Sequence, residues 1–388
     1  MMTNEAAIQA LARLQVGMQH PYIPAFIHWK YRDEPVLTRG GQRYATAAFA
    51  VPPLMADDLE AILGPLTAAI PTDDLVGDPT YRDLLAAAGR PPFDGATYTL
   101  RTLTANDNTL RIDCALGGYF AMLDTCDALE WEALSQAESL TGETEADFQR
   151  FDALLTQRQR LHELVAHPVR DGSHRSVGMA VSVSIAYRHR GKLSLLMRKR
   201  SAGVAVHPNL VHVVPSFMLG PTTPHIQDEY AIRHHIFREY LEELFDRPEA
   251  SHDEANWHYF YDDPRLLALQ GWLRSGAARL SLTGVSMDLL NLRADVCAIL
   301  VCDSEEWYER HMAPDAAPHD AVIYNQEYNN QDASEQDAYP ETIIPYDPTV
   351  SDAEMLARYP VLSPHRMTPT AAGAFWLGVD QLRQMGIE

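Results

Sequence analysis

The sequence has little positive charge. Lysine and arginine together number 31 against 53 aspartates and glutamates, which gives a formal net charge of −22 at pH 7. A surface that binds DNA needs clustered lysines and arginines to neutralise phosphates, so direct DNA binding is not expected. The simplest consequence of this charge is solubility.

Cysteine and long apolar runs are scarce as well. The four cysteines, Cys114, Cys126, Cys297 and Cys302, include no C-x-x-C pair and no zinc-finger spacing. Cys297 and Cys302 stand in an apolar run, which predicts buried thiols. No stretch of about 18 uncharged apolar residues occurs, so no membrane span is expected. The N-terminal sequence is not typical of a signal peptide, and a cytoplasmic protein without membrane association is predicted.

The first part of the chain resembles an ordinary globular domain. With 388 residues, of which 46% are hydrophobic, the chain is long enough for two or three domains with full cores. Residues 98–104 and 109–114 alternate at period two around an Asn-Asp-Asn turn, which predicts a hairpin. We therefore interpret residues 1–142 as an N-terminal α+β domain. Apolar residues at helical spacing predict a linker helix over 143–170.

The middle of the chain has strand and helix patterns in a recognisable order. Apolar runs on either side of Gly191 predict a hairpin over 177–200. A helix is predicted from Glu229 to Phe245, with apolar residues at every fourth position, and Asp246-Arg247-Pro248 should end it. Residues 280–303 read as two further core strands. Residues 311–350 are rich in Asp, Glu, Asn and Gln and predict an acidic loop, followed by a helical C-terminal extension over 351–388.

The segment R-E-Y-L-E-E-L, from Arg238 to Leu244, is the strongest candidate for chemistry. Glu239, Glu242 and Glu243 stand at i, i+3 and i+4, so they share one helix face. Crowded carboxylates repel one another, and a hard divalent cation such as Mg²⁺ or Mn²⁺ relieves that repulsion. Arg238 reaches Glu242 at i+4 and would orient it. The alternative is a solvated helix face with incidental charges.

In its order of elements, this region resembles the Nudix hydrolases. The hairpin over 177–200 ends in Arg198-Lys199-Arg200, a short strand ends at Pro215, and Arg238 to Leu244 matches the core of the family's box. The resemblance implies an α/β/α sandwich over residues 171–310. It also implies that Glu239, Glu242 and Glu243 bind Mg²⁺ or Mn²⁺ and act in catalysis, with Arg198, Arg200 and Arg238 binding substrate.

The sequence departs from the family pattern at several positions. Ser216 and Phe217 replace two glycines, and the loop before Arg238 is longer than the family's. The upstream glutamate of the box falls on Tyr230, although Glu229 is adjacent. Phe245 replaces the glycine that follows the glutamate pair.

Two functions follow from the resemblance. The first is a metal-dependent hydrolase of a nucleoside diphosphate linked to another group, a Nudix-type pyrophosphohydrolase. The second is a catalytically weak sensor that binds a nucleotide-type small molecule and regulates a partner. A homodimer is left open. His234 and His235 are expected on the helix surface, and the alternative is a contact with the metal. The aromatic residues 257–261 are expected in a core or lid, and the alternative is stacking on a nucleobase.

Overall fold

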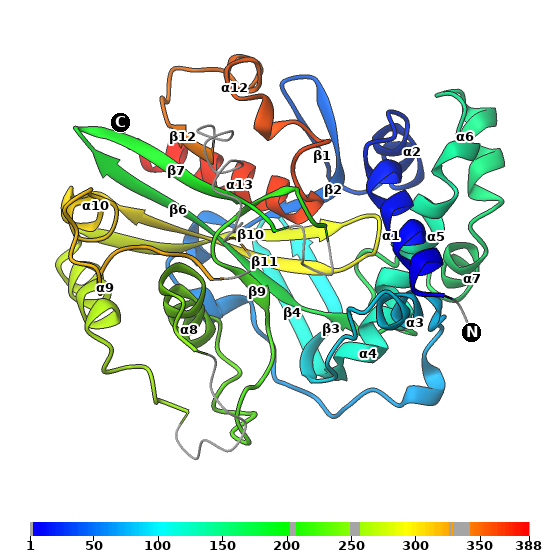
Figure 1. Cartoon of the computed structure of the whole chain (residues 1–388), viewed down its shortest axis with the longest axis horizontal. Helices are drawn as coiled ribbons and strands as arrows, with labels where there is room; N and C mark the ends of the chain where they lie inside the picture. Colours follow the sequence, from blue (N-terminus) through cyan, green and yellow to red (C-terminus); the bar gives the residue numbers. More distant parts are fainter. Residues whose placement is uncertain (1–2, 202–206, 249–256, 326–327, 329–341, 388) are drawn as a thin grey trace. The chain divides into compact units, whose positions relative to one another are not determined.

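A computed structural model describes residues 3–201, 207–248, 257–325, 328 and 342–387 (Figure 1). The chain forms two compact units, which are described separately. Unit 1 comprises Met1–Phe49, Ile62–Met179 and Ser286–Ala294, and unit 2 comprises Ala50–Ala61, Ala180–Val285 and Asp295–Glu388. Both units combine helices with strands, so the predicted mixed α+β class is confirmed.

Unit 1 contains a hairpin, a small sheet and a group of helices. Its elements are α1 (Asn4–Met18), α2 (Ile23–Lys30), β1 (Val36–Arg39), β2 (Gln42–Ala50, of which the last residue belongs to unit 2), η3 (Thr72–Asp74), α3 (Thr80–Ala87), β3 (Ala96–Asn106), β4 (Thr109–Gly118), α4 (Tyr119–Met122), η4 (Leu123–Asp127), α5 (Ala128–Ser135), η5 (Ala137–Ser139), α6 (Glu145–Asp152), α7 (Thr156–Leu164) and β5 (Val177–Gly178). Strands β1 and β2 pair antiparallel, and the small sheet has the order β4-β3-β5. The hairpin predicted between residues 98 and 114 is confirmed as β3 and β4.

The prediction of one continuous linker helix over 143–170 is wrong, because α6 and α7 are separate helices. Helix α6 begins with a capping box between Thr144 and Asp147. Helix α7 begins after Leu155, which has no side-chain acceptor. The Glu132 carboxylate accepts hydrogen bonds from the backbone N–H groups of residues 157 and 158, at 2.7 and 3.1 Å. A carboxylate from α5 therefore caps α7 and fixes where it begins.

Unit 2 is built around a mixed sheet. Its elements are η1 (Pro53–Met55), η2 (Leu59–Ile62, ending in unit 1), β6 (Ala180–His189), β7 (Lys192–Lys199), β8 (Val211–Val213), β9 (Ser216–Met218), α8 (Ile232–Phe245), α9 (Pro264–Ser275), β10 (Ala278–Asp288, ending in unit 1), β11 (Ala294–Cys302, beginning in unit 1), α10 (Glu306–His311), β12 (Ile343–Pro345), α12 (Asp352–Arg358), η7 (Pro360–Leu362) and α13 (Pro369–Met385). The strand order is β10-β11-β6-β7-β12, with β8 beside β7 and β9 beside β6. Strand β11 runs parallel to β6, whereas β7 runs antiparallel to it.

Two helices pack on the central strand of this sheet. Both α8 and α13 contact β6, and Figure 1 shows them on opposite sides of the sheet. The Ser184 hydroxyl of β6 donates to the carbonyl of Ala374 in α13, at 3.3 Å. Because successive side chains of a strand point to opposite faces, Ser182 also lies on the α13 side.

The predicted acidic loop over 311–350 is only partly described. Residues 326–327 and 329–341 lie outside the described residues. Within the described part, Ile343–Pro345 form β12, which pairs with β7 and was not predicted. The C-terminal extension is helical as predicted. Its long helix α13 covers the central sheet of unit 2, because Phe375, Trp376 and Val379 are fully buried apolar residues.

Candidate functional site

Helix α8 is capped at its start by a residue that is distant in sequence, and it ends where the sequence predicted. Its N-cap, Ala231, offers no side-chain acceptor. The Glu60 carboxylate accepts instead from the backbone N–H groups of Ile232 and Arg233, both at 2.9 Å. At the other end, Asp246 adopts a left-handed conformation with φ 50°, so the predicted end of the helix is confirmed. The helix and its carboxylates therefore have a fixed position within unit 2.

All three glutamates of α8 are buried. Glu239, Glu242 and Glu243 are only 8%, 6% and 3% exposed, so the alternative of a solvated charged face is wrong. Nη2 of Arg238 lies 2.5 Å from Oε1 of Glu239, and its Nε lies 3.8 Å from Oε1 of Glu242. Burial disfavours the charged guanidinium, but Glu239 and Glu242 outweigh this effect and raise the pKa of Arg238. One buried cation thus contacts two of three buried anions.

Two of the carboxylates also accept hydrogen bonds from other segments. The Tyr259 hydroxyl donates to Oε1 of Glu242 at 3.2 Å, and the backbone N–H of Ser216 donates to Oε2 of Glu243 at 2.9 Å. Within the described ranges, the three glutamates do not bring their oxygens within 4.8 Å of one another. A cation on this helix would therefore be held by one or two carboxylates, with water and ligand oxygens completing its shell, as Mg²⁺ commonly is.

The loop before α8 is organised by a residue that the sequence analysis did not assign. Glu229 is fully buried, and its carboxylate accepts from the backbone N–H groups of Thr222 and Thr223, both at 2.8 Å. Both threonine hydroxyls donate to it as well. Because this side chain serves the loop, the helix begins at Ile232 rather than at the predicted Glu229. One indication of this residue was present in the sequence: Glu229 is adjacent to Tyr230, the position where the Nudix pattern has a glutamate.

The predicted substrate arginines have different surroundings. The guanidinium of Arg198, on β7, lies 4.1 Å from the ring centre of Tyr324. Arg200 follows β7, and its backbone N–H donates to the carbonyl of Leu210 at 2.8 Å. Arg238 instead contacts the carboxylates of its own helix. The two strand-end arginines and the helix arginine therefore belong to different local structures.

Tyr324 belongs to a short segment that covers the end of α8. The backbone N–H groups of Ile323 and Tyr324 donate to the carbonyl of Leu244, at 3.0 and 3.1 Å. The backbone N–H of Asn325 donates to the backbone carbonyl of Glu243 at 3.0 Å. These bonds satisfy carbonyls that a helix end otherwise leaves without partners. Burial raises the pKa of Tyr324 to about 12, so the ring that faces Arg198 is neutral.

The prediction that His234 and His235 lie on the surface is wrong. They are 3% and 0% exposed, because the aromatic residues after α8 pack over this turn. The rings of Trp257 and Phe260 lie 5.0 Å from the ring of His234. Burial, followed by the charge of Arg238, lowers the pKa of His234 to about 4. Phe260 is buried and His258 is exposed, so this cluster belongs to the core beside α8 only in part.

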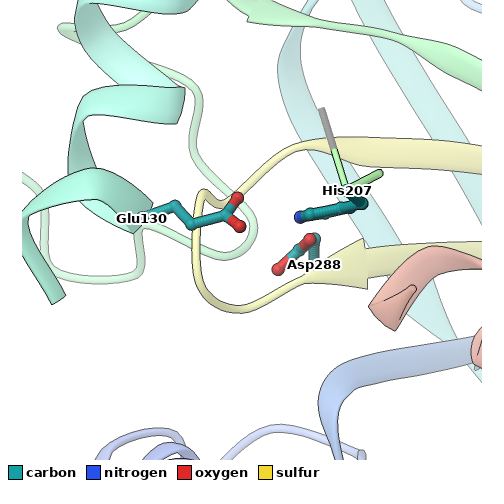
Figure 2. Close-up of side chains that lie close together, drawn as sticks. All are labelled: Glu130, His207 and Asp288. Atoms are coloured by element: carbon teal, nitrogen blue, oxygen red, sulfur yellow. The ribbon is translucent and has the colours of Figure 1, made fainter. Parts of the chain in front are cut away.

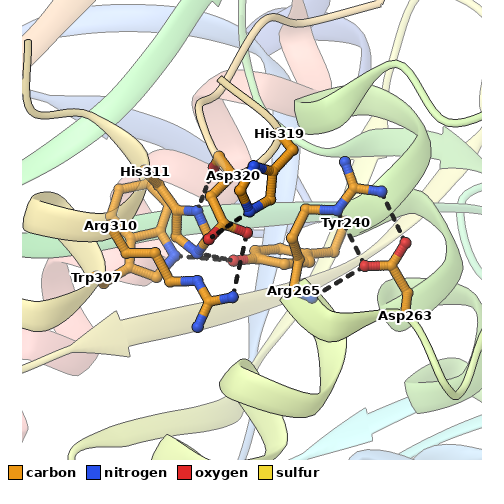
Figure 3. Close-up of polar contacts among 8 residues, drawn as sticks. All are labelled: Tyr240, Asp263, Arg265, Trp307, Arg310, His311, His319 and Asp320. Atoms are coloured by element: carbon orange, nitrogen blue, oxygen red, sulfur yellow. Dashed lines mark hydrogen bonds and ion pairs between the residues drawn. The ribbon is translucent and has the colours of Figure 1, made fainter. Parts of the chain in front are cut away.

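A polar network ties Tyr240 of α8 to α10 (Figure 3). The indole N–H of Trp307 donates to the Tyr240 hydroxyl at 3.0 Å, and this hydroxyl lies 3.4 Å from Nε2 of His311. Nδ1 of His311 donates to the carbonyl of Asp320 at 2.6 Å. Burial lowers the pKa of His311 to about 4, and a neutral ring has the one donor and one acceptor that these contacts require.

Unit 1 contains a pair of buried carboxylates of its own (Figure 2). Glu130 on α5 and Asp288 at the end of β10 are 7% and 1% exposed, and their ligand oxygens lie within 4.8 Å of each other. The amide nitrogen of Asn291 donates to both, at 2.8 and 3.2 Å. His207, also drawn in Figure 2, belongs to unit 2. The shared amide joins α5 to the turn after β10, and nothing in the sequence pattern connects these segments.

Comparison with known proteins adds no family to this description. No protein-family model matches the chain, and no curated protein shows significant sequence similarity to it. The Nudix resemblance therefore rests on the residues quoted above. Among the helices of the described residues, none combines the length and the apolar character needed to cross a membrane.

Proposed function

We propose that the protein is a divalent-cation-dependent hydrolase of a nucleoside diphosphate linked to another group, with a Nudix-like α/β/α arrangement in unit 2. The observation that supports this most strongly is the burial of Glu239, Glu242 and Glu243 on one helix. Buried carboxylates are costly unless cations compensate them. Arg238 contacts Glu239 and Glu242, and a divalent cation held by the carboxylates of this helix would add further positive charge beside them.

The donor set suits Mg²⁺ or Mn²⁺ in its chemistry. Hard cations prefer carboxylate oxygens, and α8 presents no buried thiol among its residues. Glu242 and Glu243 would hold the ion, while Glu239 would contribute once its contact with Arg238 opens. When bound, the ion would neutralise phosphate charge and activate a water molecule.

The protein's own residues would orient these groups. The Tyr259 hydroxyl holds Glu242, and the Ser216 N–H holds Glu243, so each carboxylate is fixed before a ligand arrives. A fixed glutamate near an attacking water can accept its proton. Arg198 and Arg200 would bind the phosphates of the ligand from the end of β7. The four cysteines are buried and form no disulfide, which fits the proposed cytoplasmic location.

The second candidate is a sensor that binds a nucleotide-type ligand and hydrolyses it poorly or not at all. A specific observation favours it: Arg238 already contacts Glu239 and Glu242, and Tyr324 already stacks on Arg198. Catalysis would need these side chains for the metal and the substrate, so both contacts would have to break first. A sensor needs only the binding energy of the ligand, whereas an enzyme must also stabilise a transition state.

Calorimetric titration with Mn²⁺ tests the cation site. Wild type should bind the ion, and Glu242→Gln and Glu243→Gln should bind it at least about tenfold more weakly, since each loses a charged ligand. Glu309→Gln, on the exposed surface of α10, is the control and should bind as wild type does. Absence of Mn²⁺ binding at millimolar concentration, even with a nucleoside diphosphate present, would rule out the hydrolase.

A substrate panel separates the two candidates. Dinucleotides, nucleotide sugars and deoxynucleoside triphosphates are incubated with Mg²⁺, and phosphate release is measured. Hydrolysis lost in Glu243→Gln and retained in Glu309→Gln supports the enzyme. Tight, metal-dependent binding without turnover of any member supports the sensor.

A further inference from the structure

Three polar side chains form a hydrogen-bonded chain on the α13 side of the central sheet in unit 2, and a buried histidine lies beside it. The Ser182 hydroxyl on β6 donates to Oδ2 of Asp295 on β11 at 2.6 Å. Its oxygen lies 3.2 Å from the hydroxyl of Ser216 on β9, and that hydroxyl lies 3.4 Å from Nε2 of His212 on β8. Ser182, His212 and Asp295 are 0%, 4% and 4% exposed. Ser182 and Asp295 are thus buried, and the partly buried Ser216 is the outer member of the chain.

The protons of this chain have a defined order. Nδ1 of His212 donates to the carbonyl of Val213 at 3.0 Å, which leaves Nε2 as an acceptor. The hydroxyls of Ser216 and Thr370 both lie 3.4 Å from that nitrogen. Burial lowers the pKa of His212 to about 3, so the ring stays neutral and keeps this acceptor. At the other end Ser182 donates its single proton to Asp295 and therefore accepts from Ser216. The single proton of Ser216 is then committed to Ser182, and Nε2 of His212 accepts from Thr370.

This chain of hydrogen-bonded side chains reaches Ser216, whose backbone N–H donates to Glu243. Strand β9 has only three residues, Ser216–Met218, and its pairing with β6 places Ser216 opposite Ser182. So short a strand has few backbone hydrogen bonds to fix it. The backbone N–H of Ser216 donates to Oε2 of Glu243 at 2.9 Å. Any shift of β9 would therefore move the donor away from this carboxylate.

We infer that Asp295, Ser182 and Ser216 are positioning residues that hold the Ser216 N–H against Glu243 and so keep this carboxylate ready for its ligand. None of the three side chains touches the ligand itself. The inference rests on the proposed function in so far as Glu243 is a cation ligand. Its structural part, the fixed position of Ser216, does not depend on that function.

The strand offers a matched pair of serines for the test. Ser182 and Ser184 both belong to β6, face α13 and are 0% and 1% exposed. Ser182 belongs to the chain, whereas Ser184 donates to the carbonyl of Ala374. Ser182→Ala and Ser184→Ala each remove one buried hydroxyl from the same strand face. They should cost similar global stability, but only the first should disturb Ser216.

Two measurements on the full chain are made for both variants. The first is hydrogen exchange of the Ser216 amide, which should be about tenfold faster in Ser182→Ala and unchanged in Ser184→Ala, since one hydrogen bond is lost. The second is Mn²⁺ affinity, which should fall several-fold in Ser182→Ala alone. If Ser182→Ala does not fold, Asp295→Asn replaces it. That variant keeps an acceptor for Ser182 but removes the charge, so a smaller change of the same sign is expected.

The outcomes separate this inference from the proposed function. Equal exchange of the Ser216 amide in both serine variants overturns the inference, whatever the metal does. Faster exchange in Ser182→Ala alone, in a protein whose wild type binds no Mn²⁺, supports the positioning chain and counts against the hydrolase. Faster exchange together with weaker Mn²⁺ binding supports both.

Discussion

The loop that precedes α8 depends on one buried carboxylate, and Glu229→Gln tests that dependence directly. Oε1 of Glu229 accepts from the N–H and hydroxyl of Thr223, and Oε2 accepts from those of Thr222. Glutamine has nearly the same size, but one of its terminal atoms is an NH₂ group that donates. The hydroxyl that faces it can rotate and accept, whereas the backbone N–H that faces it cannot.

The expected cost follows from this geometry. One backbone N–H loses its acceptor in a buried site, which costs about 1–3 kcal/mol, and the remaining bonds lose their charge assistance. We expect Glu229→Gln to lower the free energy of unfolding by about 2–4 kcal/mol. The loop should also open locally, because the N–H groups of both threonines depend on this side chain.

Urea denaturation and hydrogen exchange provide the assay. Urea denaturation gives the free energy of unfolding. Hydrogen exchange of the Thr222 and Thr223 amides shows whether the loop opens locally. Asp228→Asn is the control, since Asp228 is exposed and its contact with His225, at 3.6 Å, is a surface ion pair. That change should stay within about 0.5 kcal/mol of wild type. If Glu229→Gln also stays within that range, with both amides still protected, the loop is held by something other than this carboxylate.

Three further predictions use the surroundings of α8. The pKa of His311, about 4 in the folded chain against 6.5 unfolded, means that the unfolded chain takes up the proton first. The stability advantage of wild type over His311→Asn should therefore be full above pH 6.5 and shrink by up to about 3 kcal/mol toward pH 4; a constant difference in denaturation across that range contradicts it. Arg238→Met leaves buried carboxylates without their cation and should cost about 3–5 kcal/mol. Millimolar Mn²⁺ should raise the melting temperature of this variant more than that of wild type, and an equal rise in both would argue against a cation site. Tyr324→Leu should free Arg198 and raise pyrophosphate affinity about 2- to 30-fold in calorimetry; the gain should vanish when Arg198→Gln is added, and unchanged affinity in the single variant would exclude competition by the ring.

The local sequence pattern was sufficient to predict the strands and the helix around the site. Apolar runs separated by Gly191 predicted β6 and β7, because the turn needs a residue that tolerates positive φ, here 73°. Apolar residues at every fourth position predicted α8, and the spacing of Glu239, Glu242 and Glu243 placed them on one helix face. These inferences depend only on backbone geometry within a few residues, which a sequence states directly.

The surroundings of those elements were not predictable in the same way. His234 was expected on the surface, but the aromatic residues that bury it come from beyond the end of the helix. Ser216, which stands where Nudix sequences have a glycine, has a hydroxyl that belongs to the chain ending on Asp295. Burial depends on which segments pack together, and spacing within one segment does not contain that information.

The clearest division concerns where helices begin. The sequence by itself determined that residues 232–245 and 156–164 are helical, since their pattern is helical. It did not give the first residue of either helix, because it predicted a start at Glu229 for the one and a continuous helix from residue 143 for the other. Neither helix has a local side-chain cap, and the acceptors come instead from Glu60 and Glu132, which lie far away in the sequence. Every helix start leaves backbone N–H groups that need an acceptor, so the helical segment itself creates this requirement. Any carboxylate that reaches them will serve, so only the tertiary structure decides which residue supplies it.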